Sequence, residues 1–264
     1  MLFSSVPFLF YFLPAVMIVY FAVPDKFKNA VLLVFSLVFY AWGEPKYVFL
    51  MLFSIFSGYI FGLLIDKYRG KKASGIFLVI SVIISLGILC YFKYADFFIS
   101  NINRMTFFSI PLLRITMPIG ISFYTFQIIS YNIDVYRKSV SACKNIVNFG
   151  AYVALFPQLI AGPIVRFKDI YRDIASRKHK FDMAAVGIAR FCTGLGKKVL
   201  IANSFGLVFE IFRASGEKSV RFYWIYAVSF TLQIYYDFSG YSDMAIGLGS
   251  IFGLHFPENF NYPY

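Results

Sequence analysis

Residues 232–264 read LQIYYDFSGYSDMAIGLGSIFGLHFPENFNYPY, and they combine an apolar run with a sudden concentration of polar groups. Five polar side chains fall within seven positions: Asp237, Ser239, Tyr241, Ser242 and Asp243. If the flanking segments lie in a bilayer, an ionised aspartate near its centre costs about 2.5–3.5 kcal/mol on the insertion scale. These residues therefore predict a water-filled pocket or a polar partner inside a hydrophobic assembly.

The spacing of the two aspartates argues against a pair that shares a proton. On a helix Asp237 and Tyr241 lie on one face, whereas Asp237 and Asp243, six residues apart, point in nearly opposite directions. Asp237 then has two open roles: a general base in a dry pocket, or the hydrogen-bond partner of a Tyr or Ser on a neighbouring helix.

Small residues follow the polar cluster at helical spacing. Ala245, Gly249 and Gly253 recur every four positions, which is the pattern that lets two membrane helices approach closely. Pro257 and Asn259 are expected to break the helix after that. The stretch thus predicts a tightly packed helix that reaches about residue 256, followed by an irregular segment.

The composition places the chain among membrane proteins. Of 264 residues, 59% are apolar, 14% are charged and 21% are aromatic. This balance is far from that of soluble domains, so we predict an all-α, polytopic integral membrane protein. The net charge of +12 does not indicate nucleic-acid binding, because the basic residues fall in short loops between apolar spans. The two histidines and three cysteines lack ligand spacing, so no metal site is predicted.

Apolar segments alternate with short charged loops in the first half of the chain. Spans are predicted over residues 6–23, 29–42, 47–65, 75–94 and 115–136, with a mixed connector at 95–114. Gly58 and Gly62 have the spacing of a helix-packing motif. The loops at 24–28, 66–72 and 137–144 are basic, which predicts that all three lie on the cytoplasmic side.

The next apolar segment, residues 146–165, contains helix breakers. Pro157, Gly162 and Pro163 make a straight lipid-facing helix improbable, and Gln158 adds a polar side chain. Non-helical backbone at membrane depth is tolerated where it lines a cavity or is buried in protein. We therefore predict a broken or re-entrant segment that forms one wall of a site; an ordinary kinked span is the alternative.

Residues 181–215 are amphipathic and then apolar, with Lys197 and Lys198 in the middle. The run Gly-Leu-Gly-Lys-Lys does not match a phosphate-binding loop, because Phe191 stands where that loop needs glycine. It predicts a break between two helices whose lysines contact lipid headgroups, or else an anionic cofactor. A further span is predicted over residues 222–240.

Several separated motifs resemble a known family. They are YYDFSGYSDMAIGLGSIFGLHFPENFNYPY, PIGISFYTFQIISYNIDVYR at 118–137, LFPQLIAGPIVRF at 155–167, the opening MLFSSVPFLFYFLP and FYAWGEPKY at 39–47. Together they resemble the membrane-bound O-acyltransferases, in the bacterial branch that O-acetylates alginate. The resemblance implies helices around a central tunnel in the bacterial inner membrane, crossed several times by the chain.

The resemblance also implies a reaction. An acyl thioester such as acetyl-CoA, or an acyl carrier, would deliver an acyl group, in the first instance acetyl, from the cytoplasm, with no permanently bound cofactor. The acceptor would be a cell-surface polysaccharide such as alginate or a periplasmic or extracellular acetyltransferase partner protein. The tunnel-lining candidates are Gln158, Gly162, Pro163, Asp237, Tyr241, Ser242 and Asn259.

In this family the catalytic histidine lies in a Trp-His-Ile-Ser-like motif shortly after the NFNYPY stretch, and this sequence ends at Tyr264. No residue of the chain is therefore predicted to be catalytic, and residues 1–264 are expected to be the amino-terminal portion of a single membrane domain that is inactive alone. His179 is interpreted as a surface residue of a cationic loop and His255 as the tip of a helix.

A transporter or channel is the alternative functional class. Intramembrane aspartates and broken helices are typical of such proteins too. Against it, no internal repeat places a second broken segment at a matching position in the other half of the chain.

Overall fold

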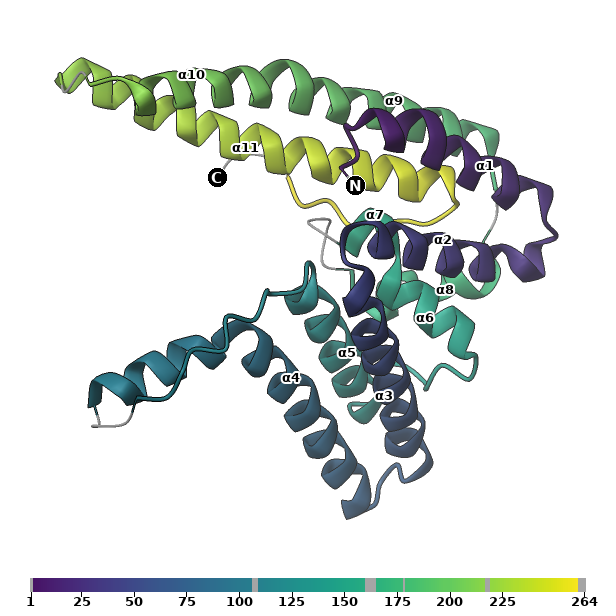
Figure 1. Ribbon diagram of the computed structural model, residues 1–264. Coiled ribbons are helices and arrows are strands. Elements are labelled where there is room, and N and C mark those ends of the chain that lie inside the picture. The colour runs from purple at the N-terminus through teal and green to yellow at the C-terminus, as the bar shows by residue number, and fades with distance from the viewer. Residues whose placement is uncertain (1, 106–108, 160–164, 178, 217–218, 261–264) are drawn as a thin grey trace. The chain divides into compact units, whose positions relative to one another are not determined.

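The computed structural model describes residues 2–105, 109–159, 165–177, 179–216 and 219–260, and within these ranges every regular element is a helix (Figure 1). The chain divides into two compact units. The terminal unit comprises Met1–Ala22, Ala161–Val165 and Asp169–Tyr264, and the central unit comprises Val23–Ile160 and Arg166–Lys168. The predicted all-α class is confirmed, while the single domain and the central tunnel stay predictions.

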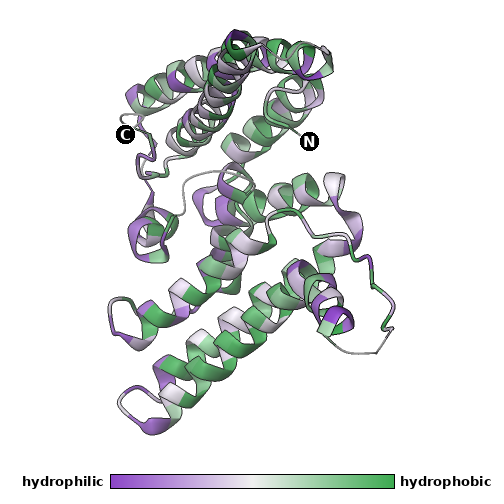
Figure 2. Cartoon of the chain, turned by 90° about the vertical axis from the view of Figure 1, so that its left-hand side faces the viewer, coloured by the Kyte–Doolittle hydropathy of each residue, from purple (hydrophilic) through white to green (hydrophobic). Residues whose placement is uncertain are grey.

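The central unit is a bundle of helices joined by short turns. Its elements are η2 (Asp25–Phe27), α2 (Lys28–Gly43), η3 (Pro45–Tyr47), α3 (Val48–Lys67), α4 (Lys72–Met105), α5 (Ile121–Tyr136), α6 (Ile146–Ala154) and α7 (Phe156–Leu159). Two stretches of helix in the described chain are long and apolar enough to cross a membrane, Pro45–Lys67 and Lys72–Met105. Figure 2 shows long hydrophobic runs along the helices, with hydrophilic residues gathered near the loops.

Glycines bring α3 and α5 into close contact, as the spacing of Gly58 and Gly62 predicts. A Cβ atom at Gly58 would lie 2.5 Å from Cγ2 of Ile128, and one at Gly62 would lie 2.6 Å from Cε1 of Tyr131. The missing side chains therefore make room for an isoleucine and a tyrosine of the neighbouring helix. Asn132 adds a polar tie, since its amide donates to the Ser81 hydroxyl of α4 at 2.7 Å.

Two of the three basic loops meet within the central unit. The Arg69 guanidinium donates to the Val140 carbonyl at 3.3 Å, which joins the loop after α3 to the loop after α5. At the start of α2, Asn29 donates to Asn148 of α6 at 2.8 Å. The loops after α3 and α5 therefore lie together, as their charges predict, while the cytoplasmic side of all three loops stays a prediction.

The connector after α4 differs from the prediction. Helix α4 continues to Met105, about ten residues beyond the predicted span, and the chain then runs back along it. Asn103 bonds both backbone groups of Ile110, at 2.8 and 3.0 Å, and the Asp96 carboxylate accepts the amides of Leu113 and Arg114 at 2.7 and 2.9 Å. Polar residues of the predicted connector thus lie on α4 and bond the returning backbone.

Cys143 offers a test of the packing around the basic loop at 137–144. Its side chain is buried, and its amide donates to the Tyr131 hydroxyl at 2.9 Å. Burial raises the pKa of the Cys143 thiol, so little thiolate exists at neutral pH. With Cys90 and Cys192 replaced by alanine, we expect iodoacetamide to alkylate Cys143 about tenfold more slowly than a cysteine placed at the exposed Ser141.

The control for this measurement is the Ser141→Cys, Cys143→Ala chain, which carries its thiol two residues away in the same loop. The rate at Cys143 should rise with pH until the thiol ionises and should match the control after denaturation in SDS. Equal rates in the folded protein would contradict the buried position.

The terminal unit is built around a long helical hairpin. Its elements are η1 (Phe8–Phe12), α1 (Leu13–Ala22), α8 (Phe167–Ser176, whose first two residues belong to the central unit), α9 (Phe181–Gly196), η4 (Lys197–Ala202), α10 (Asn203–Ala214) and α11 (Val220–Ile251). Helices α9 and α10 lie alongside α11 (Figure 1). The predicted break near Lys197 is wrong: the helix continues through it as the π-helical stretch η4.

Gly253 ends α11, and it does so earlier than the prolines predict. Its φ of 74° lies in the left-handed region that favours glycine, the Leu254 amide donates to the Gly249 carbonyl at 2.8 Å, and the Gly253 amide donates to the Ser250 carbonyl at 3.2 Å. This is the hydrogen-bond pattern of a Schellman C-cap. Gly253 is therefore a helix terminator and not a helix-packing residue.

Candidate functional site

Two pairs of glycines hold the hairpin of the terminal unit together. A Cβ atom at Gly194 would lie 2.5 Å from the Gly240 carbonyl oxygen, and one at Gly240 would lie 2.8 Å from that of Gly194. Gly187 and Gly247 face each other in the same reciprocal way, at 2.7 and 2.6 Å. The backbones of α9 and α11 therefore touch directly. The sequence signal is the seven-residue spacing of glycines on both helices, which differs from the four-residue repeat of Ala245, Gly249 and Gly253.

A partly buried ion pair lies beside these glycines. The Asp243 carboxylate accepts from Arg190, at 3.1 Å from Nε and 2.9 Å from Nη2, and from the Lys197 ammonium at 2.6 Å. The Asp243 side chain is 13% exposed, so water has little access to it. The two cations balance its negative charge there. Such charge-assisted bonds are the strong ones in proteins.

Two further pairs extend this arrangement. Lys198 forms an ion pair with Asp237, and Arg190 also binds Glu258 of the segment after α11. We call the six residues the charged seam: Arg190, Lys197, Lys198, Asp237, Asp243 and Glu258. Its three cations and three carboxylates balance, so the seam carries no net charge.

The seam corrects the interpretation of both aspartates. Asp237 and Asp243, predicted to point in nearly opposite directions, both bind cations of the same neighbouring helix, because Lys and Arg side chains are long enough to reach around it. Asp237 is engaged by an ammonium group, which favours a positioning role over that of a base. Lys197 and Lys198 bind carboxylates of their own chain, where lipid headgroups or an anionic cofactor were expected.

The π-helical stretch η4 begins at this seam. A Cβ atom at Gly240 would lie 3.2 Å from Cβ of Lys197 and 3.2 Å from the Lys198 amide nitrogen, so η4 packs directly on α11 there. A π-helix fits one extra residue into a turn and occurs frequently at functional sites. It here lets two consecutive lysines reach two aspartates six positions apart.

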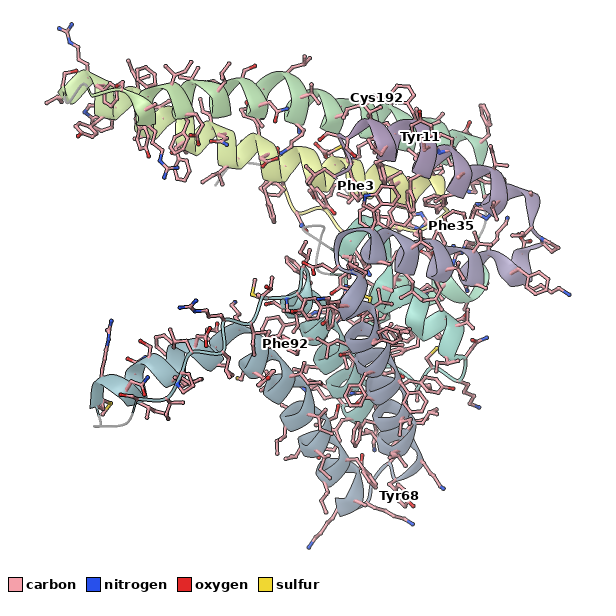
Figure 3. All side chains as sticks on the ribbon, in the orientation of Figure 1. Phe3, Tyr11, Phe35, Tyr68, Phe92 and Cys192 are labelled. Atoms are coloured by element: carbon pink, nitrogen blue, oxygen red, sulfur yellow. The ribbon has the colours of Figure 1, made fainter. Side chains whose placement is uncertain are left out.

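Tyr241 and Ser242 lie next to the seam on α11. The Tyr241 ring stacks on Phe3 from the start of the chain, with centroids 4.6 Å apart and planes 10° apart (Figure 3 labels Phe3). Ser239 and Ser242 are each 1% exposed, and among the described residues neither hydroxyl has a hydrogen-bond partner. Asp237 and Tyr241, predicted to act on one face, thus have separate partners. Two buried hydroxyls beside ion pairs mark this part of α11 as the candidate site.

The other predicted tunnel residues are placed differently. Asn259 is an exposed residue of the segment after α11. Gly162 and Pro163 lie outside the described residues. Gln158 belongs to the central unit, where it is buried on α7.

Gln158 repairs the break that the sequence predicts. Helix α6 ends at Ala154, and Leu155 turns out of it with a ψ of 111°. The Phe156 amide, which a continuous helix would pair with the Tyr152 carbonyl, donates instead to the Ser36 hydroxyl at 3.1 Å. Gln158 Nε2 takes its place on that carbonyl at 2.6 Å. The predicted break is confirmed, and the Gln158 carbonyl oxygen is left without a hydrogen-bond partner among the described residues.

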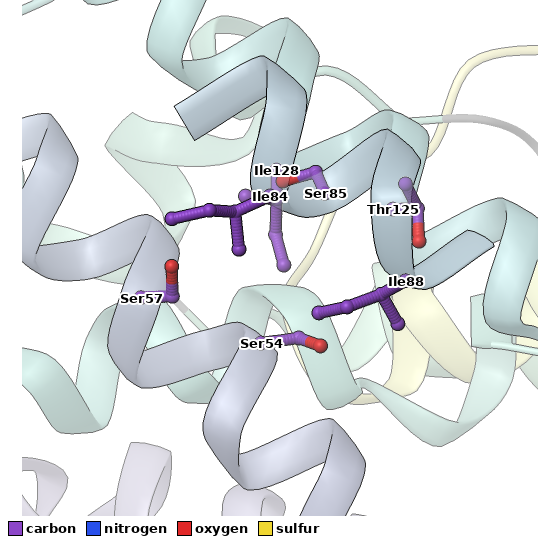
Figure 4. A pocket seen from close by; sticks show the side chains of 7 residues that line it. All are labelled: Ser54, Ser57, Ile84, Ser85, Ile88, Thr125 and Ile128. Carbon is purple, nitrogen blue, oxygen red and sulfur yellow. The ribbon is translucent and has the colours of Figure 1, made fainter. Parts of the chain in front are cut away.

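A small polar cavity lies between α3, α4 and α5. Its volume is about 10 Å³, which is room for about one water molecule. Hydroxyls of Ser54, Ser57, Ser85 and Thr125 share the wall with three isoleucines (Figure 4). None of the seven predicted tunnel residues lines this cavity, so it is a separate feature of the bundle.

Both histidines have partners within the terminal unit. His255 was predicted at a helix tip but lies in the loop after α11, where its amide and its Nδ1 both meet the Asp173 carboxylate, at 2.9 and 3.0 Å. The exposed ring of His179 packs edge-on against Tyr20 and Phe21. The Tyr20 hydroxyl, fully buried, donates to the Phe252 carbonyl at 2.9 Å and thereby ties α1 to the end of α11.

Comparison with known proteins relates the whole chain to acyl-transfer enzymes. It is 43% identical, over all of its length and 52% of the relative, to "Probable alginate O-acetylase AlgI" of Pseudomonas aeruginosa. It is 32% identical, over all of its length and 56% of the relative, to "Peptidoglycan O-acetyltransferase" of Helicobacter pylori. Identity to "Teichoic acid D-alanyltransferase" of Bacillus subtilis is 26%, over 55% of this chain and 38% of the relative.

These relatives agree with the motifs of the sequence. No protein-family model matches the chain. The chain spans about half the length of the curated relatives it matches. Since the identity to the alginate O-acetylases extends over every element described above, the chain belongs to the membrane-bound O-acyltransferase family.

Proposed function

We propose that the chain is the amino-terminal part of a membrane O-acyltransferase that O-acetylates a cell-surface polysaccharide such as alginate. The observation that carries the proposal is the 43% identity to an alginate O-acetylase along the whole chain. The acyl donor is a cytoplasmic thioester, acetyl-CoA or an acyl carrier. The acceptor is the polysaccharide or a periplasmic or extracellular acetyltransferase protein, and the enzyme crosses the bacterial inner membrane several times.

Acyl transfer to a hydroxyl sets three requirements. It needs a base for the hydroxyl proton, donors for the carbonyl oxygen that becomes negative, and exclusion of water from the activated acyl group. Among the described residues, Asp237 is bound by an ammonium group, and His255 is exposed and lies outside the Trp-His motif that the family resemblance implies. Catalysis is therefore assigned to the part of the protein beyond Tyr264, where the family resemblance expects its histidine.

The described part of the chain supplies support for that centre. The charged seam holds α11 against α9. It thereby fixes the positions of the buried Ser239 and Ser242 hydroxyls relative to α9. These hydroxyls are the donors that the proposal places beside the acyl passage. In the central unit, the carbonyl oxygen of Gln158 is a separate polar group, buried and without a hydrogen-bond partner among the described residues.

The proposal is tested by acetyl transfer in membranes. Membranes that contain the full-length protein are expected to transfer radiolabelled acetyl from acetyl-CoA to exopolysaccharide, while the chain ending at Tyr264 gives no transfer above membranes without it. Activity of the short chain would refute the assignment of catalysis to the remaining part. A full-length protein that moves solutes across liposomes without any acyl donor, and transfers no acetyl, would support a transporter instead.

A matched control separates the two histidine assignments. His255→Ala in the full-length protein should keep acetyl transfer within about twofold of the unaltered level, because its ring is exposed and serves Asp173. A loss of a hundredfold or more would instead make His255 the base.

A further inference from the structure

An apolar groove in the central unit plays no part in the proposed acyl transfer. It lies between α2, α3 and α6 and is lined by Leu33, Leu52, Ile55, Phe56, Ile146, Val147 and Gly150. Its volume of about 340 Å³ falls within the range of about 300–1,000 Å³ that is typical of ligand pockets. No lining residue carries a polar side chain, so the groove suits a hydrocarbon and not a sugar or a nucleotide.

The depth of the groove comes from Gly150. A Cβ atom there would lie 3.2 Å from Cδ1 of Leu33 and 3.6 Å from Cγ2 of Ile55, so the missing side chain leaves these two residues as its floor. Its rim is open, since Leu52 is 40% exposed and Ile146 is 41% exposed. Leu52 lies on α3, one of the helices long and apolar enough to cross a membrane.

One end of the groove meets the basic loop at 137–144. Ile146 and Val147 open α6, and the residue just before the cap of that helix is the exposed Lys144. Lys144 is held beside α3, because the Tyr59 hydroxyl donates to its carbonyl at 2.8 Å one helical turn beyond Phe56. Among the described residues no carboxylate forms an ion pair with Lys144. The apolar groove therefore ends beside the positive charge of Lys144.

We propose that this groove binds one acyl chain of an anionic phospholipid whose phosphate lies at Lys144. The apolar groove opens sideways from a predicted membrane helix and matches the acyl chain of such a lipid, while Lys144 at its end matches the phosphate. One lysine strengthens the binding of an anionic headgroup about fivefold. The inference rests on the membrane placement in the proposed function. A further segment of the same protein is the competing occupant, and the test below separates the two.

The test measures lipid bound to the full-length protein in detergent by native mass spectrometry, with dioleoyl phosphatidylglycerol and dioleoyl phosphatidylethanolamine as probes. Ile146→Trp and Leu52→Trp each fill the groove from its open rim and should weaken phosphatidylglycerol binding at this site about tenfold or more. Lys144→Gln should weaken phosphatidylglycerol about fivefold and leave phosphatidylethanolamine unchanged. The matched control is Ile76→Trp on α4, at a 58% exposed position outside the groove, which should change neither.

Each outcome decides the matter. Equal lipid binding by Ile146→Trp, Leu52→Trp and Ile76→Trp in folded protein overturns the lipid site. So does a fluorophore attached to a cysteine at Leu52 that brominated phosphatidylglycerol fails to quench, because polypeptide then covers the groove. The two rim variants lie on different helices. If one of them fails to fold, the other still tests the groove. If alkaline carbonate washes the protein off membranes, the membrane placement itself fails, which is a different result from an embedded protein that binds no lipid here.

Discussion

Replacing Gly194 with alanine is expected to lower the free energy of unfolding by about 1–3 kcal/mol and to separate α9 from α11. The new methyl group would lie 2.5 Å from the Gly240 carbonyl oxygen and 2.8 Å from the Met244 amide nitrogen. Both are backbone atoms, so neither can turn aside as a flexible side chain would. The gain in helix propensity from glycine to alanine, about 1 kcal/mol, offsets only part of the strain. Unfolding in SDS, followed by tryptophan fluorescence, measures the change.

Gly196→Ala is the matched control for this prediction. It is the same substitution two residues along the same helix, and no atom lies within 4 Å of the new Cβ. We expect it to be neutral or to stabilise the protein by up to about 1 kcal/mol. If Gly194→Ala behaves like Gly196→Ala, the close glycine contact between α9 and α11 does not exist in the protein.

Asp243→Asn is expected to destabilise the protein by about 2–3 kcal/mol, the second large effect. Removing one partner of a fully buried ion pair costs about 3–5 kcal/mol, because the other charge is left without compensation. The loss here is smaller, since Lys197 is 33% exposed and Arg190 keeps Glu258. The same SDS titration measures it, and acetyl transfer by the full-length protein should fall with it if the seam positions α11.

Asp237→Asn controls for the removal of a carboxylate from the same helix. Asp237 is 45% exposed and binds a single lysine, so its loss should cost no more than about 1 kcal/mol. In a double-mutant cycle, Lys197→Gln should cost less in the Asp243→Asn background than alone. Equal losses from the two asparagine variants, or strict additivity in the cycle, would show that Asp243 is not the centre of the seam.

Local features of the fold were predictable where one segment contains all the information. Gly58 and Gly62 predicted a close helix contact, which α5 provides, and Pro157 predicted the break that occurs at Leu155. Both signals depend on intrinsic properties, the absence of a side chain and the absence of an amide hydrogen, which act wherever the residue is placed. The family was likewise recognisable from motifs quoted along the chain, and the relatives confirm it.

The candidate site was predicted only in part. The crowding of polar residues from Asp237 to Asp243 pointed to the stretch of the candidate site, and the structure adds that Ser239 and Ser242 are buried without a hydrogen-bond partner among the described residues. The identity of the partners was missed, because Arg190 lies 53 residues before Asp243 and Lys198 lies 39 residues before Asp237. Helical periodicity describes the faces of one helix and contains nothing about which other helix covers them.

By itself, the sequence determined the class of the protein: an apolar, helical chain with basic loops, with glycine and proline at its contacts and breaks. The tertiary structure alone decided what the polar residues of α11 do. Pairing Asp243 with Arg190 and Lys197 requires that two helices distant in sequence lie glycine against glycine, and that η4 carries its lysines onto that contact. The physical reason is that an ion pair depends on the distance between two charges in space, which the fold sets and the spacing along the chain does not.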